Sequence, residues 1–263
     1  MIEPDPDILV LRLPKSLMRY DTRYRSINYS SYFPPGVKWL LISNVVIFLV
    51  MYIGGNAISQ HMLLLALTPI AVLEHFAIYQ LVTYMFLHGG IDHILFNMLA
   101  LWMFGMTLEQ DWGTRRFLKY YFLCGVGAGL CDVTVNAIIG NWGTHTIGAS
   151  GAIFGLLLAF GVLYPNVTVL FFFIFPMKAK YMVMIVGGIA FLGALHVNSG
   201  VSNIAHLGGM AFGYAYLRMR FFKFKVDLGY FQREYNAWKL RRAKKRFQVY
   251  LRKHGSDRDT RVN

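Results

Sequence analysis

Apolar residues dominate three long windows of this 263-residue chain, and charged side chains are nearly absent from them. Residues 39–107 carry only Glu74 and Asp92, residues 120–177 carry only Asp132, and residues 181–217 carry no charge. A helix needs about 20 predominantly apolar residues to cross a bilayer. The windows therefore predict several membrane-spanning helices separated by short breaks.

We expect six such helices, which makes the fold class an all-α polytopic membrane protein. Their apolar cores lie at residues 39–53, 92–108, 117–138, 150–164, 181–197 and 203–219. Two further apolar stretches, 62–73 and 167–175, are shorter than the roughly 17 residues needed to cross. We interpret them as segments in the membrane interface or in a re-entrant loop.

The basic residues support this helix count. All 26 Lys and Arg residues fall within residues 1–38, 115–119, 178–180 and 218–263. With six spans these regions lie on one side of the membrane, and the opposite loops carry none. The positive-inside rule makes that side cytoplasmic, so both termini are predicted to be cytoplasmic.

The predicted organisation therefore has three parts. A cytoplasmic N-terminal segment covers residues 1–38, and a membrane core covers residues 39–219, with a long external loop at 54–91. A basic cytoplasmic tail covers residues 220–263.

The net charge of +13 does not indicate nucleic-acid binding, because the positive-inside distribution of the basic residues already accounts for it. Residues 230–253 alternate aromatic and basic side chains, which is typical of a helix on the anionic inner leaflet. A solvated tail that mainly fixes topology explains the same composition equally well. The N-terminus lacks the features of a signal or transit peptide, which favours a bacterial plasma membrane. We find no metal-ligand spacing and no cofactor motif, and we interpret Cys124 and Cys131 as buried small side chains.

Polar residues inside a membrane are costly, so each is a candidate functional residue. His93 and Asn97 are four residues apart and share one face of the second predicted helix. Ser150 begins the fourth predicted helix, and His206 lies near the start of the sixth. All four are at the predicted external ends of their helices.

Each of these residues also has a simpler interpretation. A serine beside glycine usually serves helix packing, a lone histidine can relay protons or make a polar contact, and His93 with Asn97 can hydrogen-bond between helices. Their shared depth favours a single site. Gly151 beside the serine, and Gly209 and Gly213 on the face of His206, would let two helices approach until hydroxyl and imidazole are about 3 Å apart.

Such a site suits acyl transfer. A neutral imidazole can take the serine proton and return it to a leaving amine. His93, Asn97 and the backbone N–H of Ser150 can stabilise the oxyanion that forms. No carboxylate belongs to the group, so a Ser150–His206 dyad is more economical than a triad, with His145 as a second candidate base.

Three motifs in this order resemble the rhomboid intramembrane serine proteases. In chain order they are the spacing of His88, His93 and Asn97, then Gly148-Ala149-Ser150-Gly151, and then Ala205-His206 followed by Gly209 and Gly213, all within residues 79–217. The resemblance implies a six-transmembrane-helix rhomboid-like bundle with Ser150 as nucleophile and His206 as general base and acid. It also implies an oxyanion hole of His93, Asn97 and the Ser150 amide, supported by His88 and the motif glycines, and stacking of Phe154 on His206.

The resemblance further implies that the substrates are single-span membrane proteins, cut near the external end of the span. The external loop would be semi-submerged, and Tyr79-Gln80 replaces a Trp-Arg pair found in some members. Asp132 and Asn136 match no motif, and we interpret them as a polar contact near the outer surface. Gly187-Gly188 suggests that the fifth helix moves to admit substrate.

Two other functions remain open. A catalytically inactive relative that binds membrane-protein clients would typically lack the serine or the histidine, and both are present here. A proton-coupled transporter using His206 would be expected to have paired carboxylates in the membrane and an internal repeat.

Overall fold

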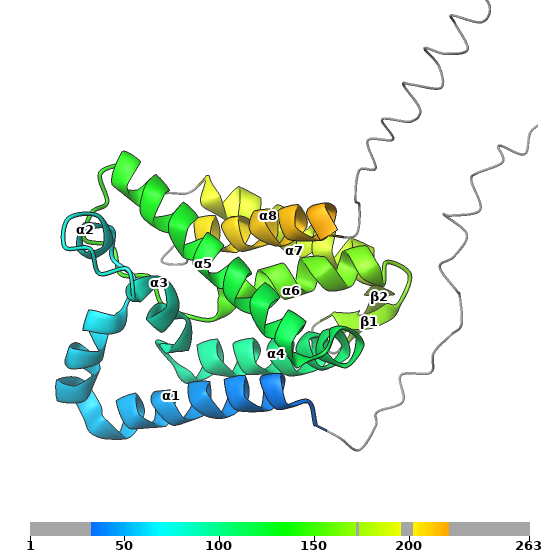
Figure 1. Ribbon diagram of the computed structural model, residues 1–263, viewed down its shortest axis with the longest axis horizontal. Helices are drawn as coiled ribbons and strands as arrows, with labels where there is room; N and C mark the ends of the chain where they lie inside the picture. The colour runs from blue at the N-terminus through cyan, green and yellow to red at the C-terminus, as the bar shows by residue number, and fades with distance from the viewer. Residues whose placement is uncertain (1–32, 172–173, 196–201, 221–263) are drawn as a thin grey trace, which may run out of the picture.

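The computed structural model describes residues 33–171, 174–195 and 202–220 (Figure 1). Most of the predicted N-terminal segment, all but the first residue of the predicted tail and the end of the fifth predicted helix lie outside the described residues.

Among the described residues, a long helix lies at each of the six predicted positions. These are α1 (Pro35–Met62), α4 (Ile91–Trp112), α5 (Thr114–Ile138), α6 (Ser150–Leu163), α7 (Ala179–Ala194) and α8 (Asn203–Arg220). Three of them are long and apolar enough to cross a membrane, namely α4, α5 and the Pro35–Gly55 part of α1. The chain is therefore mostly helical, and the number of spans remains a prediction.

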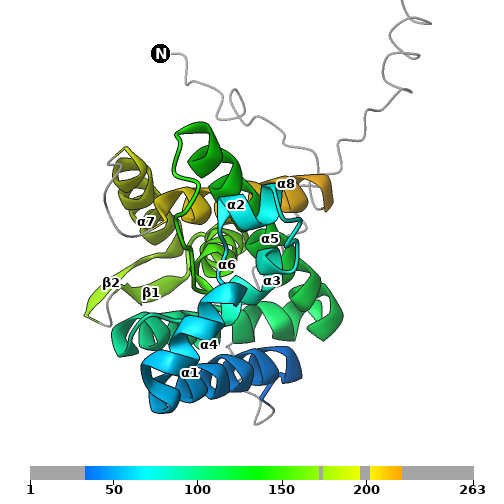
Figure 2. The ribbon, with the colours of Figure 1, turned by 90° about the vertical axis from the view of Figure 1, so that its left-hand side faces the viewer.

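Helix α6 lies in the middle of the bundle, in contact with α4, α5, α7 and α8 (Figures 1 and 2). Helix α1 packs along α4 on one side, and α7 packs against α6 and α8 on another. Most side chains of α6 are buried, whereas α1 and α7 expose many large apolar side chains. Exposed apolar faces on outer helices are what a lipid environment stabilises.

Glycines allow the closest of these helix contacts. A Cβ atom added at Gly209 of α8 would overlap the backbone carbonyl of Gly151 on α6. A Cβ added at Gly155 would lie 2.5 Å from the sulfur of Cys124 on α5. Small residues therefore bring α5, α6 and α8 nearly into backbone contact, as is common in membrane bundles.

The helices alternate in direction, so that their connections lie at two ends of the bundle. One end holds the start of α1, the α4–α5 turn, the α6–α7 connection and the end of α8 (Figure 1). The described Lys and Arg residues lie in these segments. The other end holds the short helices η1 (Leu63–Leu65), α2 (Pro69–Leu73), α3 (Gln80–Thr83) and η2 (Tyr84–Phe86).

A buried glutamate joins three helices at the basic end. Glu109 of α4 accepts hydrogen bonds from the backbone N–H groups of Gly36 (2.7 Å) and Val37 (2.6 Å) in the first turn of α1. The Thr114 hydroxyl at the start of α5 donates to the same carboxylate at 2.7 Å. Because α1 has no side-chain cap of its own, Glu109 satisfies its first amides and complements its dipole.

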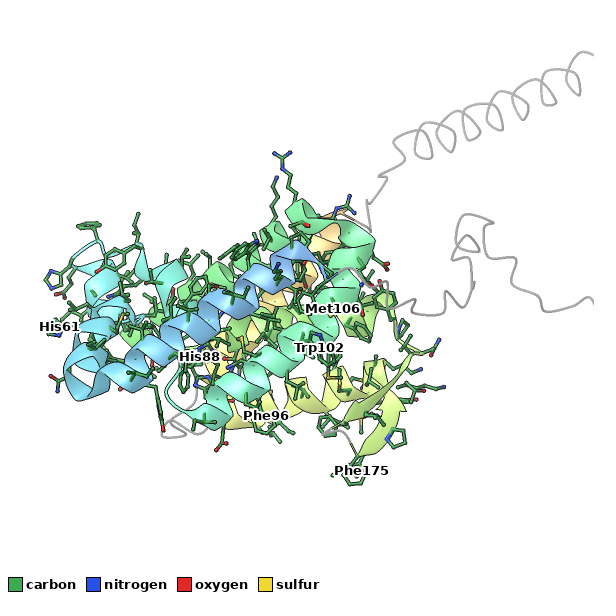
Figure 3. All side chains as sticks on the ribbon, turned by 90° about the horizontal axis from the view of Figure 1, so that it is seen from below. His61, His88, Phe96, Trp102, Met106 and Phe175 are labelled. Carbon is green, nitrogen blue, oxygen red and sulfur yellow. The ribbon has the colours of Figure 1, made fainter. Side chains whose placement is uncertain are left out.

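The all-α prediction is incomplete at residues 167–175, which contain a strand. β1 (Thr168–Phe171) pairs antiparallel with β2 (Phe175–Lys178), with Thr168 opposite Lys178. The run is too short for a spanning helix, and its valines and phenylalanines favour strands. Pairing satisfies the backbone groups between α6 and α7, and Phe175 projects away from the bundle (Figure 3).

Helix α1 breaks at Gly55, where φ is 65° and ψ is −162°, and a second helical stretch runs from there to Met62 at the start of the predicted external loop. The buried Gln80 holds the loop together. Its Nε2 donates to the Leu64 carbonyl at 2.9 Å, and its Oε1 accepts the Thr68 N–H at 3.1 Å. The loop exposes several large apolar side chains, among them Phe76, as expected for a segment in the membrane interface.

Candidate active site

Ser150 is the first residue of α6, directly after a glycine turn. Gly148 has a φ of 119°, a backbone conformation that residues with a Cβ atom rarely adopt. Its N–H donates to the Tyr84 carbonyl at 2.9 Å. This turn directs the chain into α6, so that the backbone N–H of Ser150 lies at a helix N-terminus. The role of Tyr84 could not be predicted from the sequence, because it contributes a backbone carbonyl, which every residue has, and only the fold brings that carbonyl to Gly148.

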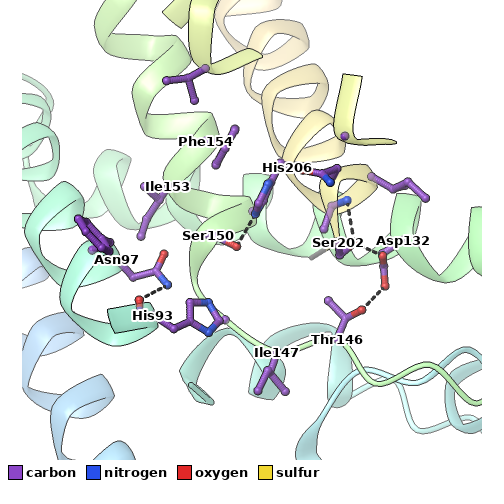
Figure 4. A pocket seen from close by; sticks show the side chains of 18 of the residues that line it. His93, Asn97, Asp132, Thr146, Ile147, Ser150, Ile153, Phe154, Ser202 and His206 are labelled. Atoms are coloured by element: carbon purple, nitrogen blue, oxygen red, sulfur yellow. Dashed lines mark hydrogen bonds between the residues drawn. The ribbon is translucent and has the colours of Figure 1, made fainter. Parts of the chain in front are cut away.

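The Ser150 hydroxyl meets the imidazole of His206. Ser150 Oγ lies 2.8 Å from His206 Nε2, although the two residues are 56 positions apart (Figure 4). His206 is in the first turn of α8, and its backbone N–H donates to the Ser202 carbonyl at 3.3 Å. The glycine contacts between α6 and α8 bring the two helix starts side by side. His145 lies exposed on the rim of the same cavity.

The ring of Phe154 fixes the plane of the His206 imidazole. The two rings are stacked, with centroids 4.0 Å apart and planes 7° from parallel. Phe154 lies one turn after Ser150 on α6, so the helix that carries the hydroxyl also orients its partner. Stacking limits rotation of the imidazole away from Ser150.

His93 lies close to Ser150, on the opposite side from His206 (Figure 4). A Cβ added at Gly148 would lie 2.7 Å from His93 Nε2 and 3.8 Å from Ser150 Oγ. The Gly89 N–H donates to His93 Nδ1 at 3.5 Å, which leaves the ring hydrogen on Nε2. His93 therefore presents an N–H donor toward the region beside Ser150.

Asn97 lies one turn further along α4 and is almost fully buried. Its Nδ2 donates to the His93 carbonyl at 2.8 Å. The amide carries a second hydrogen that this bond does not use. Asn97 also lines the cavity around Ser150, so the second hydrogen can serve a group bound there.

His88 supports His93 and does not touch the serine. The two rings are edge to face with centroids 5.0 Å apart. Burial, and then the proximity of His93, lowers the pKa of His88 to about 4. His88 is therefore uncharged at pH 7 and packs behind His93.

Gly213, the last glycine of the third motif, leaves room for a side chain of α5. A Cβ atom at this position would overlap the Tyr120 hydroxyl.

The side chains around Ser150 line a cavity of about 1360 Å³ that also has α7 residues in its wall. Its inner part is lined by Ser150, His206, His93 and Asn97. Its outer part lies between α4 and α7 and is lined mainly by apolar side chains, including Phe96, Met103, Phe171, Met182 and Val186. The cavity thus joins a polar centre around Ser150 to an apolar passage.

The family model of the Rhomboid domain matches residues 75–222, which include all of these side chains. The chain belongs to the rhomboid family.

Curated relatives of this rhomboid come from plants, bacteria and yeast. It is 33% identical to RHOMBOID-like protein 1 of Arabidopsis thaliana over 172 residues, 65% of this chain and 41% of the relative. It is 27% identical to Rhomboid protease GluP of Bacillus subtilis over 176 residues, 67% of this chain and 32% of the relative. It is 33% identical to Rhomboid protein 1, mitochondrial, of Saccharomyces cerevisiae over 139 residues, 50% of this chain and 38% of the relative.

The chain thus spans about a third to two fifths of the length of these relatives. The match establishes a membrane protein of the rhomboid family.

Proposed function

We propose that this rhomboid is an intramembrane serine endopeptidase that cleaves transmembrane segments of other membrane proteins near their external ends. The hydrogen bond between Ser150 and His206, inside a cavity with an apolar passage, is the observation that carries this proposal.

Ser150 and His206 would act as a dyad. With its ring hydrogen on Nδ1, His206 accepts the Ser150 proton at Nε2 while Oγ attacks the scissile carbonyl carbon. Collapse of the tetrahedral intermediate breaks the C–N bond, and the imidazolium returns the proton to the leaving amine. A water molecule, deprotonated by His206 in the same way, then hydrolyses the acyl-enzyme and frees Ser150.

The oxyanion would be stabilised by donors on both sides of the serine. The Ser150 backbone N–H is available at the start of α6, His93 offers Nε2–H, and Asn97 offers its second amide hydrogen. Loss of one such donor typically costs about a hundredfold or more in rate. The network requires no metal or cofactor for this chemistry.

We also propose a six-span topology with both ends of the core on the cytoplasmic side. The alternation of the six helices and the gathering of the described cations at one end support it. Ser150 then lies toward the external side. In this scheme residues 1–38 and 220–263 are cytoplasmic extensions, and the loop between α1 and α4 is external.

Substrate would enter between α4 and α7. The apolar passage there suits a lipid-soluble helix, and the polar centre suits a strand unwound from it. A continuous helix hides its carbonyls in backbone hydrogen bonds, so substrates with glycine or proline near the cut should be preferred.

The test is cleavage of a labelled single-span protein by the full chain in proteoliposomes. We expect wild-type protein to cut it, and Ser150→Ala and His206→Ala to lose at least about a thousandfold in rate. Ser43→Ala is the matched control, because Ser43 bonds only to its own helix, α1, and should cleave normally. Equal cleavage by all four proteins would refute the proposal.

A further inference from the structure

Asp132 is a fully buried carboxylate near the predicted external end of α5, and the proposed chemistry does not use it. It lies on α5 with 0% of its surface exposed. Burying a carboxylate is costly unless several donors compensate it, so such a residue needs a structural or functional reason.

Donors from three segments converge on this carboxylate. The Thr146 hydroxyl donates to Oδ2 at 2.7 Å, and Asn136 Nδ2 donates to Oδ1 at 3.1 Å. The Ser202 hydroxyl also donates to Oδ1 (Figure 4). The three partners come from α5 itself, from the loop before α6 and from the residue before α8.

Two of these partners each precede one half of the dyad by four residues. Thr146 leads through the Gly148 turn to Ser150, and Ser202 leads to His206. The Ser202 hydroxyl oxygen accepts the Ala205 N–H at 3.2 Å. Ser202 is therefore the N-cap of α8, and Asp132 fixes the orientation of that cap.

Thr146 is held in a second direction as well. Its N–H donates to the Leu67 carbonyl at 2.8 Å and its carbonyl accepts the Leu67 N–H at 3.0 Å. The segment that leads to Ser150 is thus fixed between the external loop on one side and Asp132 on the other.

We propose that Asp132 is a positioning residue that sets the relative placement of Ser150 and His206. It acts through Thr146 and Ser202, and it contacts neither member of the dyad. Helices α6 and α8 meet through glycine surfaces, which lack interlocking side chains that would fix their starts. Asp132 supplies that fixed point. The inference rests on the proposed function, since it assumes that the dyad is reactive.

The experiment measures the dyad directly, as the rate at which a fluorophosphonate probe labels Ser150 in the full-length protein. The kcat and KM for a labelled single-span substrate and the thermal unfolding temperature are measured alongside. The variants are Asp132→Ala, Thr146→Val and Ser202→Ala, with Thr146→Ser and Ser202→Thr as variants that keep the hydroxyl.

Glu109→Ala is the matched control, because it removes another buried carboxylate that joins three helices, at the opposite end of the bundle from Ser150. We expect Asp132→Ala, Thr146→Val and Ser202→Ala to lower the labelling rate and kcat about tenfold to a hundredfold with KM within twofold. Thr146→Ser and Ser202→Thr should restore most of the rate. Glu109→Ala should lower the unfolding temperature. At temperatures below that lowered value, the variant should be labelled at the wild-type rate.

Two outcomes overturn the inference. If wild-type protein is active and the Thr146→Val and Ser202→Ala variants label at its rate, Asp132 only stabilises the fold. This comparison holds even if Asp132→Ala fails to fold. If wild-type protein itself is neither labelled nor active, the proposed function fails, and the positioning role fails with it.

Discussion

At the scale of single residues, the site depends on one glycine conformation. Glycine is required at position 148 for two separate reasons: its φ is positive, and a Cβ atom there would collide with His93. The motif that contains it could be found in the sequence, but its neighbours could not. His93 and Tyr84 are more than 50 positions away along the chain.

Gly148→Ala should impair the site more than the fold. The new Cβ would lie 2.7 Å from His93 Nε2, and a left-handed alanine costs about 1–2 kcal/mol. We expect fluorophosphonate labelling of Ser150 to slow at least about tenfold because His93 must move. Gly143→Ala is the control, since a Cβ there has no atom within 4 Å and should leave the rate unchanged. Equal rates for both variants would contradict the placement of His93.

His88 predicts a pH dependence of stability. Its folded pKa of about 4 is below the value near 6.5 of an exposed histidine. Between these values the unfolded chain binds a proton that the folded protein does not, so stability is lost as pH falls from about 6.5 toward 4. We expect the unfolding temperature in detergent to fall across this window and to fall less in His88→Gln. The same slope in both proteins would show that His88 is not buried as a neutral ring.

At the scale of helices and strands, Glu109 is the attachment point of α1. We expect Glu109→Ala to cost about 2–3 kcal/mol, because two backbone N–H groups lose their acceptor. Hydrogen exchange should accelerate in the first turn of α1 and remain unchanged in α6. Asp111→Ala changes an exposed carboxylate on the same helix and should affect α1 far less. Unchanged exchange in α1 would contradict this role.

Helix positions could be predicted because lipid requires long uncharged runs, and the predicted core at 117–138 lies within α5. The β1–β2 hairpin could not be predicted, because a short apolar run can satisfy its backbone hydrogen bonds either as a helix or as a strand. Which of the two forms depends on whether a partner strand is available.

Asp132 marks the limit of sequence reasoning in the candidate site. Its position inside an uncharged window could be seen, but its partners Thr146 and Ser202 lie 14 and 70 positions away. Spacing along one helix can predict neighbours on that helix, such as Asn136 four residues after Asp132. Contacts between segments depend on how the helices pack.

At the scale of the whole molecule, the apolar passage between α4 and α7 predicts a gate. Cysteines at Met103 and Met182, on either side of the cavity, would be joined by a reducible bifunctional reagent in a background without Cys124 and Cys131. We expect cross-linking to abolish cleavage of a single-span substrate while a small fluorophosphonate still labels Ser150. Reduction should restore cleavage. Full cleavage by the cross-linked protein would show that substrate enters elsewhere.

If the proposed function holds, the 14-residue length of α6 sets the depth at which peptide bonds are cut. A helix of that length rises about 21 Å, whereas the hydrocarbon layer is about 30 Å thick. If the last turn of α6 lies at the inner boundary of the hydrocarbon layer, the Ser150 hydroxyl on its first residue lies about 9 Å below the outer boundary of that layer. Peptide bonds would then be hydrolysed at a depth that bulk solvent does not normally reach. Depth-dependent quenching of a fluorophore attached to Ser150 would measure this immersion, and a signal level with the headgroups would exclude it.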